Sequence, residues 1–290
     1  MSRIGHRKKA FVVRAGLAAP GVQWQIGVLM ASTRITNQLT RFSDRVEDYV
    51  KYRPGYPRAV LDFFIKDLGL IPTNTIADIG SGTGIFSRLL LQGGYQVIGV
   101  EPNREMRDAA ERLFKSNPRF RSVGAQAEET GLSAHSVDCV TVAQAFHWFD
   151  HSRFRKECLR IIRPGGWTVL VWNMLQFADS RFGQAYEKIK SDFGIDYQDV
   201  KKESAIQGGA MDEFFGPAGF QKFSCPNEQR FDLEGLKGRL LSSSYIPAVG
   251  HPNFEPMMKR VEAVLRDHQQ HGEVRMEYET IVFYAALERR

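Results

Sequence analysis

The sequence predicts an α/β fold built on a doubly wound, mostly parallel sheet, and two observations indicate it. Patterns typical of strands and helices alternate from about Thr75 to Asn173, which is the rhythm of successive βαβ units. The strands expected at 137–142 and 167–172 are apolar nearly throughout, as strands are when helices cover both faces of a sheet. At 290 residues and 43% hydrophobic, the chain can bury one substantial core of this kind.

A glycine turn occupies the first of these units. The apolar run 75–77 predicts a strand, the amphipathic run 85–91 predicts a helix, and a G-x-G-x-G motif at 80–84 lies between them. Glycine allows positive φ and a close approach of the backbone to a ligand. A dinucleotide fingerprint, G-x-G-x-x-G, would need glycine where Ile85 stands. The turn therefore favours a smaller, cationic adenosyl ligand and disfavours a nicotinamide oxidoreductase.

A carboxylate follows the second strand. The strand expected at 96–100 ends in Glu101, about one βαβ step after the glycine turn. A carboxylate at this place can accept hydrogen bonds from both ribose hydroxyls of an adenosine cofactor. The two motifs together, in this order, predict a cofactor site at the carboxyl ends of the first two strands.

On these motifs the chain resembles the class I S-adenosylmethionine-dependent methyltransferases from about Arg41 to its end. The resemblance implies a seven-stranded Rossmann-like sheet whose last strands, 220–231 and 274–287, make one edge antiparallel, with 163–166 as the turn before the fifth strand. It implies S-adenosylmethionine as the cofactor. The residues it assigns to cofactor binding are Asp78, Gly80, Ser81, Gly82, Gly84, Glu101, Met106, Gln126, Ala127, Ala143 and Gln144.

The same resemblance gives these residues separate roles. Asp78 would help place the amino-acid portion of the cofactor, the glycines would form the loop under it, and Glu101 would hold the ribose. Met106 would pack on the adenine, with Gln126 and Ala127 at the adenine edge. Ala143 and Gln144 would lie where the sulfonium meets the acceptor. Helices expected at 58–68, 153–162, 233–241 and 255–271 complete the fold, and segments 175–210 and 233–271 are predicted to form a lid.

The run 144–150, after the fourth strand, is the first candidate for the chemistry. Methyl transfer needs an aligned nucleophile, exclusion of water and, for a protonated nucleophile, a base. His147 is the predicted catalytic base, because an ordinary imidazole has a pKa near ~6.5, and Trp148 would wall the acceptor pocket. Alternatively, Asp150 or Ser152 caps the next helix and His147 and Trp148 only pack beneath it. No Asn-Pro-Pro-Tyr-type motif is present, which disfavours a nucleic-acid or protein-amide methylase.

The second candidate is the aromatic block 49–57, in which Tyr52, Arg53 and Tyr56 are predicted to contact the acceptor, Arg53 by pairing with a carboxylate. The alternative is an ordinary helix start at Pro57. With 144–150, 243–245 and 278–280, this block resembles the trans-aconitate methyltransferases most, which implies a small carboxylate acceptor and O-methylation. The rival class, a non-catalytic module that binds the cofactor, would carry the same cofactor motifs.

Composition narrows the partners. Cys139, Cys158 and Cys225 lie far apart without a C-x-x-C pair, which argues against a disulfide framework or a structural zinc, so no metal is expected. Seven of the basic residues precede Asp44, and without them the net charge of +6 falls to about −1. The domain itself thus offers no electrostatic reason to bind nucleic acid. We expect a cytoplasmic monomer or homodimer with a small-molecule substrate and no membrane partner.

The basic residues belong to an N-terminal extension, 1–40, that precedes a single domain at 41–290. We expect this extension to be poorly ordered. It is either a targeting peptide or an over-extended reading frame ahead of a start at Met30, and the second interpretation is favoured because the residues after Met30 resemble the family's own beginning.

Overall fold

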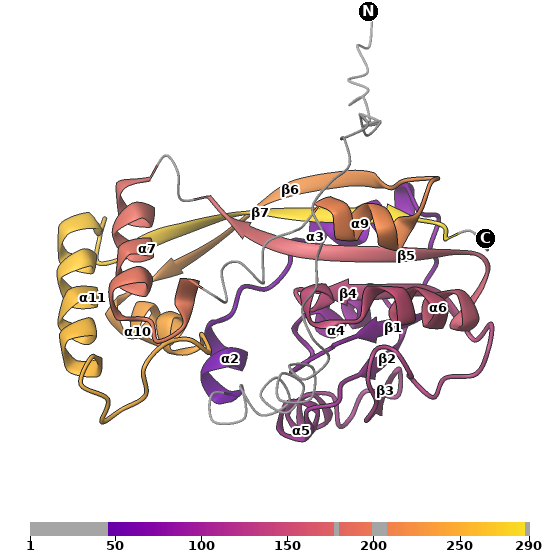
Figure 1. Ribbon diagram of the computed structural model, residues 1–290, viewed down its shortest axis with the longest axis horizontal. Helices are drawn as coiled ribbons and strands as arrows, with labels where there is room; N and C mark the ends of the chain where they lie inside the picture. Colours follow the sequence, from indigo (N-terminus) through magenta and orange to yellow (C-terminus); the bar gives the residue numbers. More distant parts are fainter. Residues whose placement is uncertain (1–45, 177–179, 199–207, 288–290) are drawn as a thin grey trace, which may run out of the picture.

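The computed structural model describes residues 46–176, 180–198 and 208–287, and a seven-stranded sheet in the order β3-β2-β1-β4-β5-β7-β6 forms its centre (Figure 1). The strands are β1 (Thr75–Ile79), β2 (Gln96–Val100), β3 (Phe120–Val123), β4 (Val137–Ala143), β5 (Ile162–Leu175), β6 (Gln221–Phe231) and β7 (Val274–Ala285). The ladders joining β1 to β5 are parallel, and β7 runs antiparallel to both of its neighbours. The strand order reverses between β1 and β4, and ligands of open α/β sheets bind at that switch point.

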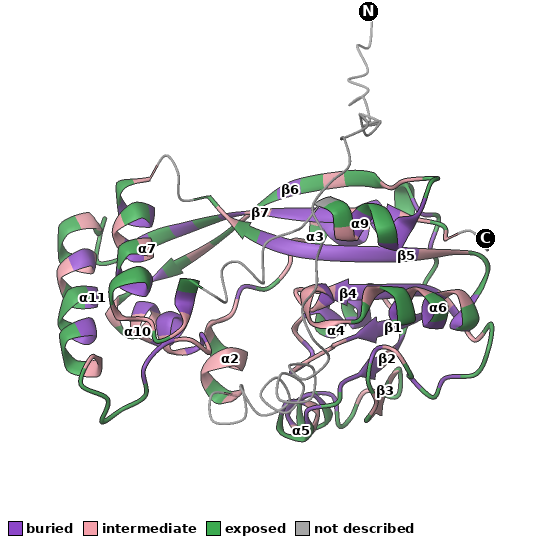
Figure 2. Cartoon of the chain, in the orientation of Figure 1, coloured by how far each residue is buried: buried purple, intermediate pink, exposed green. Residues whose placement is uncertain are grey.

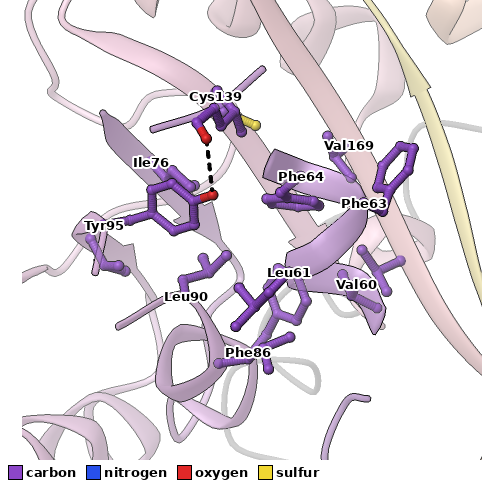
Figure 3. Packing of buried hydrophobic residues seen from close by; sticks show 14 of the residues in the cluster. Val60, Leu61, Phe63, Phe64, Ile76, Phe86, Leu90, Tyr95, Cys139 and Val169 are labelled. Carbon is purple, nitrogen blue, oxygen red and sulfur yellow. Dashed lines mark hydrogen bonds between the residues drawn. The ribbon is translucent and has the colours of Figure 1, made fainter. Parts of the chain in front are cut away.

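Helices cover both faces of the sheet, because side chains alternate between the faces along each strand. On one face, α3 (Arg58–Lys66) and α4 (Ile85–Gln92) bury Phe64, Phe86 and Leu90 against Ile76 (Figure 3). On the other face, α6 (His151–Ile161) and α9 (Gly208–Phe215) pack on Ala77, the next residue of β1. The central strands are accordingly buried along most of their length (Figure 2).

A third apolar cluster lies beyond this sandwich, at the projecting ends of β6 and β7. It joins α7 (Arg181–Phe193), α10 (Leu233–Leu241) and α11 (Phe254–His268), with the short helix α2 (Val46–Tyr52) docked on α10 (Figure 1). Helices α7, α10 and α11 come from the two predicted lid segments, whereas α9, which begins in the first of these segments, packs with α6 on the sheet. Residues 177–179 and 199–207 of the lid segments, and the predicted extension 1–40, lie outside the described residues. That the cluster closes over a cofactor stays a prediction.

Several element boundaries differ from the sequence prediction, and two of the differences have a visible structural cause. β5 begins at Ile162, so the expected turn 163–166 is a bulge within the strand: Val137 pairs with Ile162, and Cys139 next pairs with Trp167. Helix α11 ends at His268 because the chain reverses there, with the Gln270 amide donating to the Glu273 carbonyl at 2.8 Å. None of the helices in the described ranges has the length and apolar character that a bilayer crossing requires.

Candidate active site

The glycine turn places three left-handed residues between β1 and α4. Gly80, Gly82 and Gly84 have φ of 66°, 55° and 85°. A Cβ on Gly80 would lie 2.6 Å from the Ala145 Cβ, and one on Gly84 would lie 2.5 Å from the Phe114 ring. A Cβ on Gly82 would meet only the end of the Met106 side chain, at 3.4 Å. Gly80 and Gly84 therefore allow close packing, and Gly82 is the member of the motif whose face stays open to a ligand.

Asp78, at the carboxyl end of β1, is 1% exposed and held by two hydroxyls. Ser87 of α4 donates to Asp78 Oδ2 at 2.6 Å, and Thr141 of β4 donates to Oδ1 at 3.0 Å. Burial raises the pKa of Asp78 to about 6, although both hydroxyl hydrogen bonds favour the charged form. The side chain thereby joins α4 to β4, and no salt bridge among the described residues includes it.

Glu101 lies under the same loop and is 7% exposed. Its Oε2 accepts from the Gly82 amide at 2.9 Å, and its Oε1 accepts from the Asn103 amide at 2.8 Å. Burial raises its pKa above the usual range, with the two amides opposing that shift. A carboxylate oxygen has more than one acceptor direction, so both oxygens can still accept from the two hydroxyls of a ribose.

The predicted adenine side is formed by α5 (Arg104–Leu113) and the segment after β3. Met106, buried on α5, lies next to Gly82. Gln126 is exposed, whereas Ala127 is buried and packs with the sheet face that α6 covers. A shallow depression of about 400 Å³ lies beside them, lined by Val123, Gly124, Ala125, Gln126, Glu129, Thr130 and Gly131.

Backbone strain marks the end of β4. Gln144, directly after Ala143, has a φ of 60°, which is rare for a residue other than glycine and is typical of functional sites. Its amide donates to the Val171 carbonyl at 2.9 Å, and its side-chain Nε2 donates to the Asn173 carbonyl at 3.3 Å. These two bonds hold the strained residue against β5.

Asn173 of β5 connects this point to the aromatic block. Its Nδ2 donates to the Gly55 carbonyl at 3.1 Å, and its Oδ1 accepts from Thr280 and Asn227 at 2.6 and 3.2 Å. Asn227 also donates to the Gly55 carbonyl, at 2.8 Å. Side chains of β5, β6 and β7 thus hold the loop after α2 at the carboxyl edge of the sheet.

His147 and Trp148 lie on a short 3-10 helix, Phe146–Trp148, and both are partly buried. The His147 ring lies 4.6 Å from the Trp148 ring, and among the described residues its buried Nδ1 has no hydrogen-bond partner. Burial, and then the charge of His151, lower the pKa of His147 to about 4. Asp150 caps α6, as one predicted alternative has it, by accepting from the Arg153 amide at 3.0 Å.

Stability should reveal the protonation state of His147. The pKa of His147 is about 4 in the folded protein and near 6.5 in the unfolded chain. Between these two pH values the unfolded chain therefore binds more protons than the folded protein. The free energy of unfolding that depends on neutral His147 is fully present above pH 6.5 and is lost as the pH falls through 4. Allowing for partial exposure, wild type should lose roughly 2–3 kcal/mol more than His147→Asn between pH 7 and pH 4. Urea unfolding at each pH measures this difference.

Wild type has to be compared with His147→Asn because Asp78 also titrates in this pH range. Its pKa is raised to about 6, so its contribution has the opposite sign: it is present at low pH and lost as the pH rises through 6. Both variants retain Asp78, so its contribution cancels in the difference. The exposed His251 provides a matched control, and a His251→Asn variant that reproduced the His147 effect would contradict the assignment.

The aromatic block is only partly brought to this site. The Tyr56 ring contacts Phe86 of α4 at 4.8 Å, beside the glycine turn. Tyr52 instead packs on α10, where a Cβ on Gly238 would lie 2.0 Å from its ring, and its hydroxyl donates to Glu234 at 3.2 Å. Arg53 is partly exposed between them. Tyr56 thus lies beside the glycine turn and Tyr52 lies on α10, and an acceptor contact of Tyr52, Arg53 and Tyr56 stays a prediction.

Several supporting residues were not predicted from the sequence. Asn103 caps α5 through its side chain and holds Glu101 through its amide. Arg107 donates to the Glu101 carbonyl at 2.8 Å, and Asn173 organises the loop after α2. In the sequence, Asn103 is seen only as an Asn three residues before Met106, and Asn173 only as a polar residue after an apolar strand. Asn is common at helix caps and strand ends, so neither position indicated a role in the site.

The donor and acceptor set of the described residues fits a cationic adenosine ligand. Two carboxylates, Asp78 and Glu101, are buried at the ends of β1 and β2, and Glu101 accepts from the Gly82 amide. The buried Thr83 hydroxyl of the same turn has no hydrogen-bond partner in the described part of the chain. Buried acids are stabilised in their charged form by a nearby positive charge. The positive charge of such a ligand would stabilise ionised Asp78, and its ribose hydroxyls would donate hydrogen bonds to Glu101.

Comparison with known proteins points in the same direction. Residues 77–170 match the model of the methyltransferase domain family. An uncharacterised methyltransferase of Mycobacterium tuberculosis is 36% identical over 146 residues, or 50% of this chain and 56% of the relative. A Saccharomyces cerevisiae protein described as an S-adenosylmethionine-dependent methyltransferase is 29% identical over 132 residues, or 44% of this chain and 45% of the relative. The chain spans about half the length of the curated relatives it matches.

Solved structures share the fold over most of the chain. A type II methyltransferase from Anaeromyxobacter dehalogenans matches with a TM-score of 0.60 at 24% identity, covering 82% of this chain and 100% of that one. A methyltransferase from an antibiotic biosynthesis pathway of Anabaena variabilis matches with a TM-score of 0.53 at 22% identity, covering 79% and 97%. At these identities the likeness concerns the fold alone, and it confirms the predicted Rossmann-like architecture.

Proposed function

We propose that this chain is an S-adenosylmethionine-dependent methyltransferase whose acceptor is a small molecule that carries a carboxylate. The observation that carries the proposal is the pair of buried carboxylates at the ends of β1 and β2, Asp78 and Glu101, of which Glu101 accepts from the amide of the open Gly82. The match of residues 77–170 to the methyltransferase domain supports it. The bound cofactor would supply a methyl group on a sulfonium, an electrophile that needs no further activation by the protein.

The chain's own residues would bind, orient and exclude water. Glu101 would accept from the ribose hydroxyls, Met106 would cover the adenine, and Asp78 would offset the positive charge of the ligand. Gln144, held in a strained conformation by Val171 and Asn173, would line the point where methyl transfer occurs. Fixed geometry of this kind is the main source of acceleration when the leaving group is already good.

The low pKa of His147 favours a carboxylate as the nucleophile. A base with a pKa of about 4 removes protons poorly from an alcohol or an amine at neutral pH. A carboxylate acceptor is already ionised there and needs no base. His147 and Trp148 would then serve as pocket walls, and the reaction would be an O-methylation of the kind that the trans-aconitate subgroup resemblance implies.

Arg53 is proposed as the cationic residue that binds the carboxylate of the acceptor. It is partly exposed, its charge has no carboxylate partner among the described residues, and the loop that carries it is held beside Gln144 by Asn173. A guanidinium binds a carboxylate through two parallel hydrogen bonds. A soluble, cytoplasmic monomer or homodimer without nucleic-acid partners belongs to this proposal and is consistent with the near-neutral charge after residue 43.

Methyl transfer to a panel of carboxylic acids tests the proposal. With radiolabelled cofactor, Arg53→Gln should raise KM for the methylated acid at least about tenfold, since a charged hydrogen-bond pair is worth roughly 1.5–3 kcal/mol, with kcat changed much less. Arg58→Gln, five residues away and exposed on α3, should leave both constants unchanged. Cofactor binding without product from any small-molecule acceptor would instead support the non-catalytic binding module.

A further inference from the structure

Arg239 is a buried cation that the proposed methyl transfer does not yet use. It belongs to α10 and is 6% exposed within the helical cluster of α7, α10 and α11. Arginine is seldom buried without an ion pair, because removing its charge from water is costly. No ion pair among the described residues includes it, and the groups that influence its charge are tyrosines, Tyr278, Tyr186 and Tyr245.

Arg53 meets Arg239 at Ser242. The Arg53 Nη2 donates to the Ser242 carbonyl at 2.8 Å, and the Arg239 Nη1 donates to the Ser242 hydroxyl at 3.4 Å. Burial, and after it the nearby charge of Arg239, lower the pKa of Arg53. Two like charges are therefore held together in a region of low water content, which is unfavourable for the protein alone.

Most donors of the two guanidiniums have no acceptor in the described part of the chain. Each guanidinium carries five N–H groups. Arg53 uses one in a hydrogen bond and stacks its face on Tyr49 at 4.9 Å, while its buried Nε has no partner. Among the residues that the structure describes, Arg239 donates only to Tyr278 and Ser242, both at a long 3.4 Å. Glu234, the acid of α10, is engaged by Lys51 and Tyr52.

We propose that Arg53 and Arg239 together bind one carboxylate of the acceptor, a different group from the one that is methylated. Two guanidiniums present the paired donors that a carboxylate accepts, and its negative charge would relieve their mutual repulsion. A carboxylate held in this way has its lone pairs occupied by hydrogen bonds and is a poor nucleophile. The methyl-accepting atom therefore lies elsewhere on the acceptor, toward Gln144 and His147.

This inference rests on the proposed function and narrows its substrate class. Gly55, two residues after Arg53, is fixed by Asn173, whose carbonyl accepts from Gln144. The anion site and the proposed point of methyl transfer are thus joined through one short, fixed loop. If the methylated group is itself a carboxylate, the acceptor carries two carboxylates, and Arg239 is a specificity-determining residue that selects for the second.

Thermal unfolding with succinate, monomethyl succinate and dimethyl succinate tests the site. In the presence of S-adenosylhomocysteine and at constant ionic strength, succinate and its monomethyl ester should both raise the Tm of wild type, and the uncharged diester should not. Arg239→Gln should weaken that response at least about tenfold in apparent Kd. Lys237→Gln, on the same helix but paired with Glu262, should respond as wild type does.

The outcomes separate this inference from the proposed function. A wild-type response no greater than that to sodium chloride, or an unchanged response in Arg239→Gln, would overturn the anion site. If Arg239→Gln does not fold, Arg239→Lys is tested in its place. Lysine keeps the positive charge but lacks the paired N–H donors of the guanidinium, so the apparent affinity for succinate should still fall several-fold. The Arg239 variants should bind the cofactor with wild-type affinity. If the wild-type protein itself does not bind the cofactor, that result counts against the proposed function and not against the anion site.

Discussion

Replacing Glu101 by Ala is expected to weaken S-adenosylmethionine binding roughly 100-fold to 1000-fold. The buried carboxylate is positioned by the Gly82 and Asn103 amides and would accept from both ribose hydroxyls. Hydrogen bonds to a charged acceptor contribute roughly 1.5–3 kcal/mol each, and two bonds near the lower end of that range, about 3–4 kcal/mol together, correspond to this loss of affinity. Isothermal titration with the cofactor and with S-adenosylhomocysteine measures the change.

A second substitution separates charge from shape. Glu101→Gln keeps the side-chain volume but turns one acceptor into an NH₂ that faces the Gly82 or the Asn103 amide, so it should bind the cofactor nearly as poorly as Glu101→Ala. Glu111→Gln, exposed on the neighbouring helix α5, is the control and should bind normally. Wild-type affinity in a folded Glu101→Ala protein would show that the ribose lies elsewhere.

Gly84→Ala is expected to destabilise the folded protein by roughly 2–5 kcal/mol. The residue has a φ of 85°, and its new Cβ would lie 2.5 Å from the Phe114 ring. The left-handed conformation costs a residue with a Cβ about 1–2 kcal/mol, and overpacking adds roughly 1–3 kcal/mol. Thermal unfolding should show a loss of roughly 2–4 °C for each kcal/mol in a domain of this size.

Gly82→Ala is the matched comparison within the same turn. Its φ of 55° is also left-handed, but its Cβ would meet only the flexible end of Met106, at 3.4 Å. This variant should therefore lose about 1–2 kcal/mol of stability and yet bind the cofactor much more weakly, because the methyl group would occupy the open face of the turn. Equal destabilisation of the two variants would contradict the separate roles that we give to these glycines.

The fold was predictable because its signals are local. The alternation of strand and helix patterns and the spacing of the glycine turn depend on residues close in the chain. They anticipated β1, α4 and β2, and with them the seven-stranded sheet. Prediction failed at 163–166, where a proline and two glycines indicate a turn, but the ladder to β4 continues past them as a bulge. Pairing between strands, which no local pattern reports, extended β5.

Short motifs also gave the predicted cofactor residues, since Asp78 lies near the end of β1 and the glycines and Glu101 directly follow β1 and β2. That these residues bind the cofactor stays a prediction. The residues that support them could not be found from such motifs. Ser87 and Thr141 converge on Asp78 from α4 and β4, and nothing in either segment distinguishes them from ordinary helix or strand residues. The pKa of His147 depends on burial in the same way, and a sequence pattern carries only the ordinary imidazole value.

The sequence by itself therefore determined the class of fold and predicted where a cofactor would bind, because hydrophobic periodicity and glycine spacing act over a few residues. Only the tertiary structure decided which side chains from distant segments lie together. It turned Tyr52 onto α10 and brought Arg53 to Ser242, 189 residues further along the chain, beside Arg239. Arg53 and Arg239 come together because helices pack on the projecting strands β6 and β7. No sequence pattern predicts the proximity of two residues so far apart in the chain.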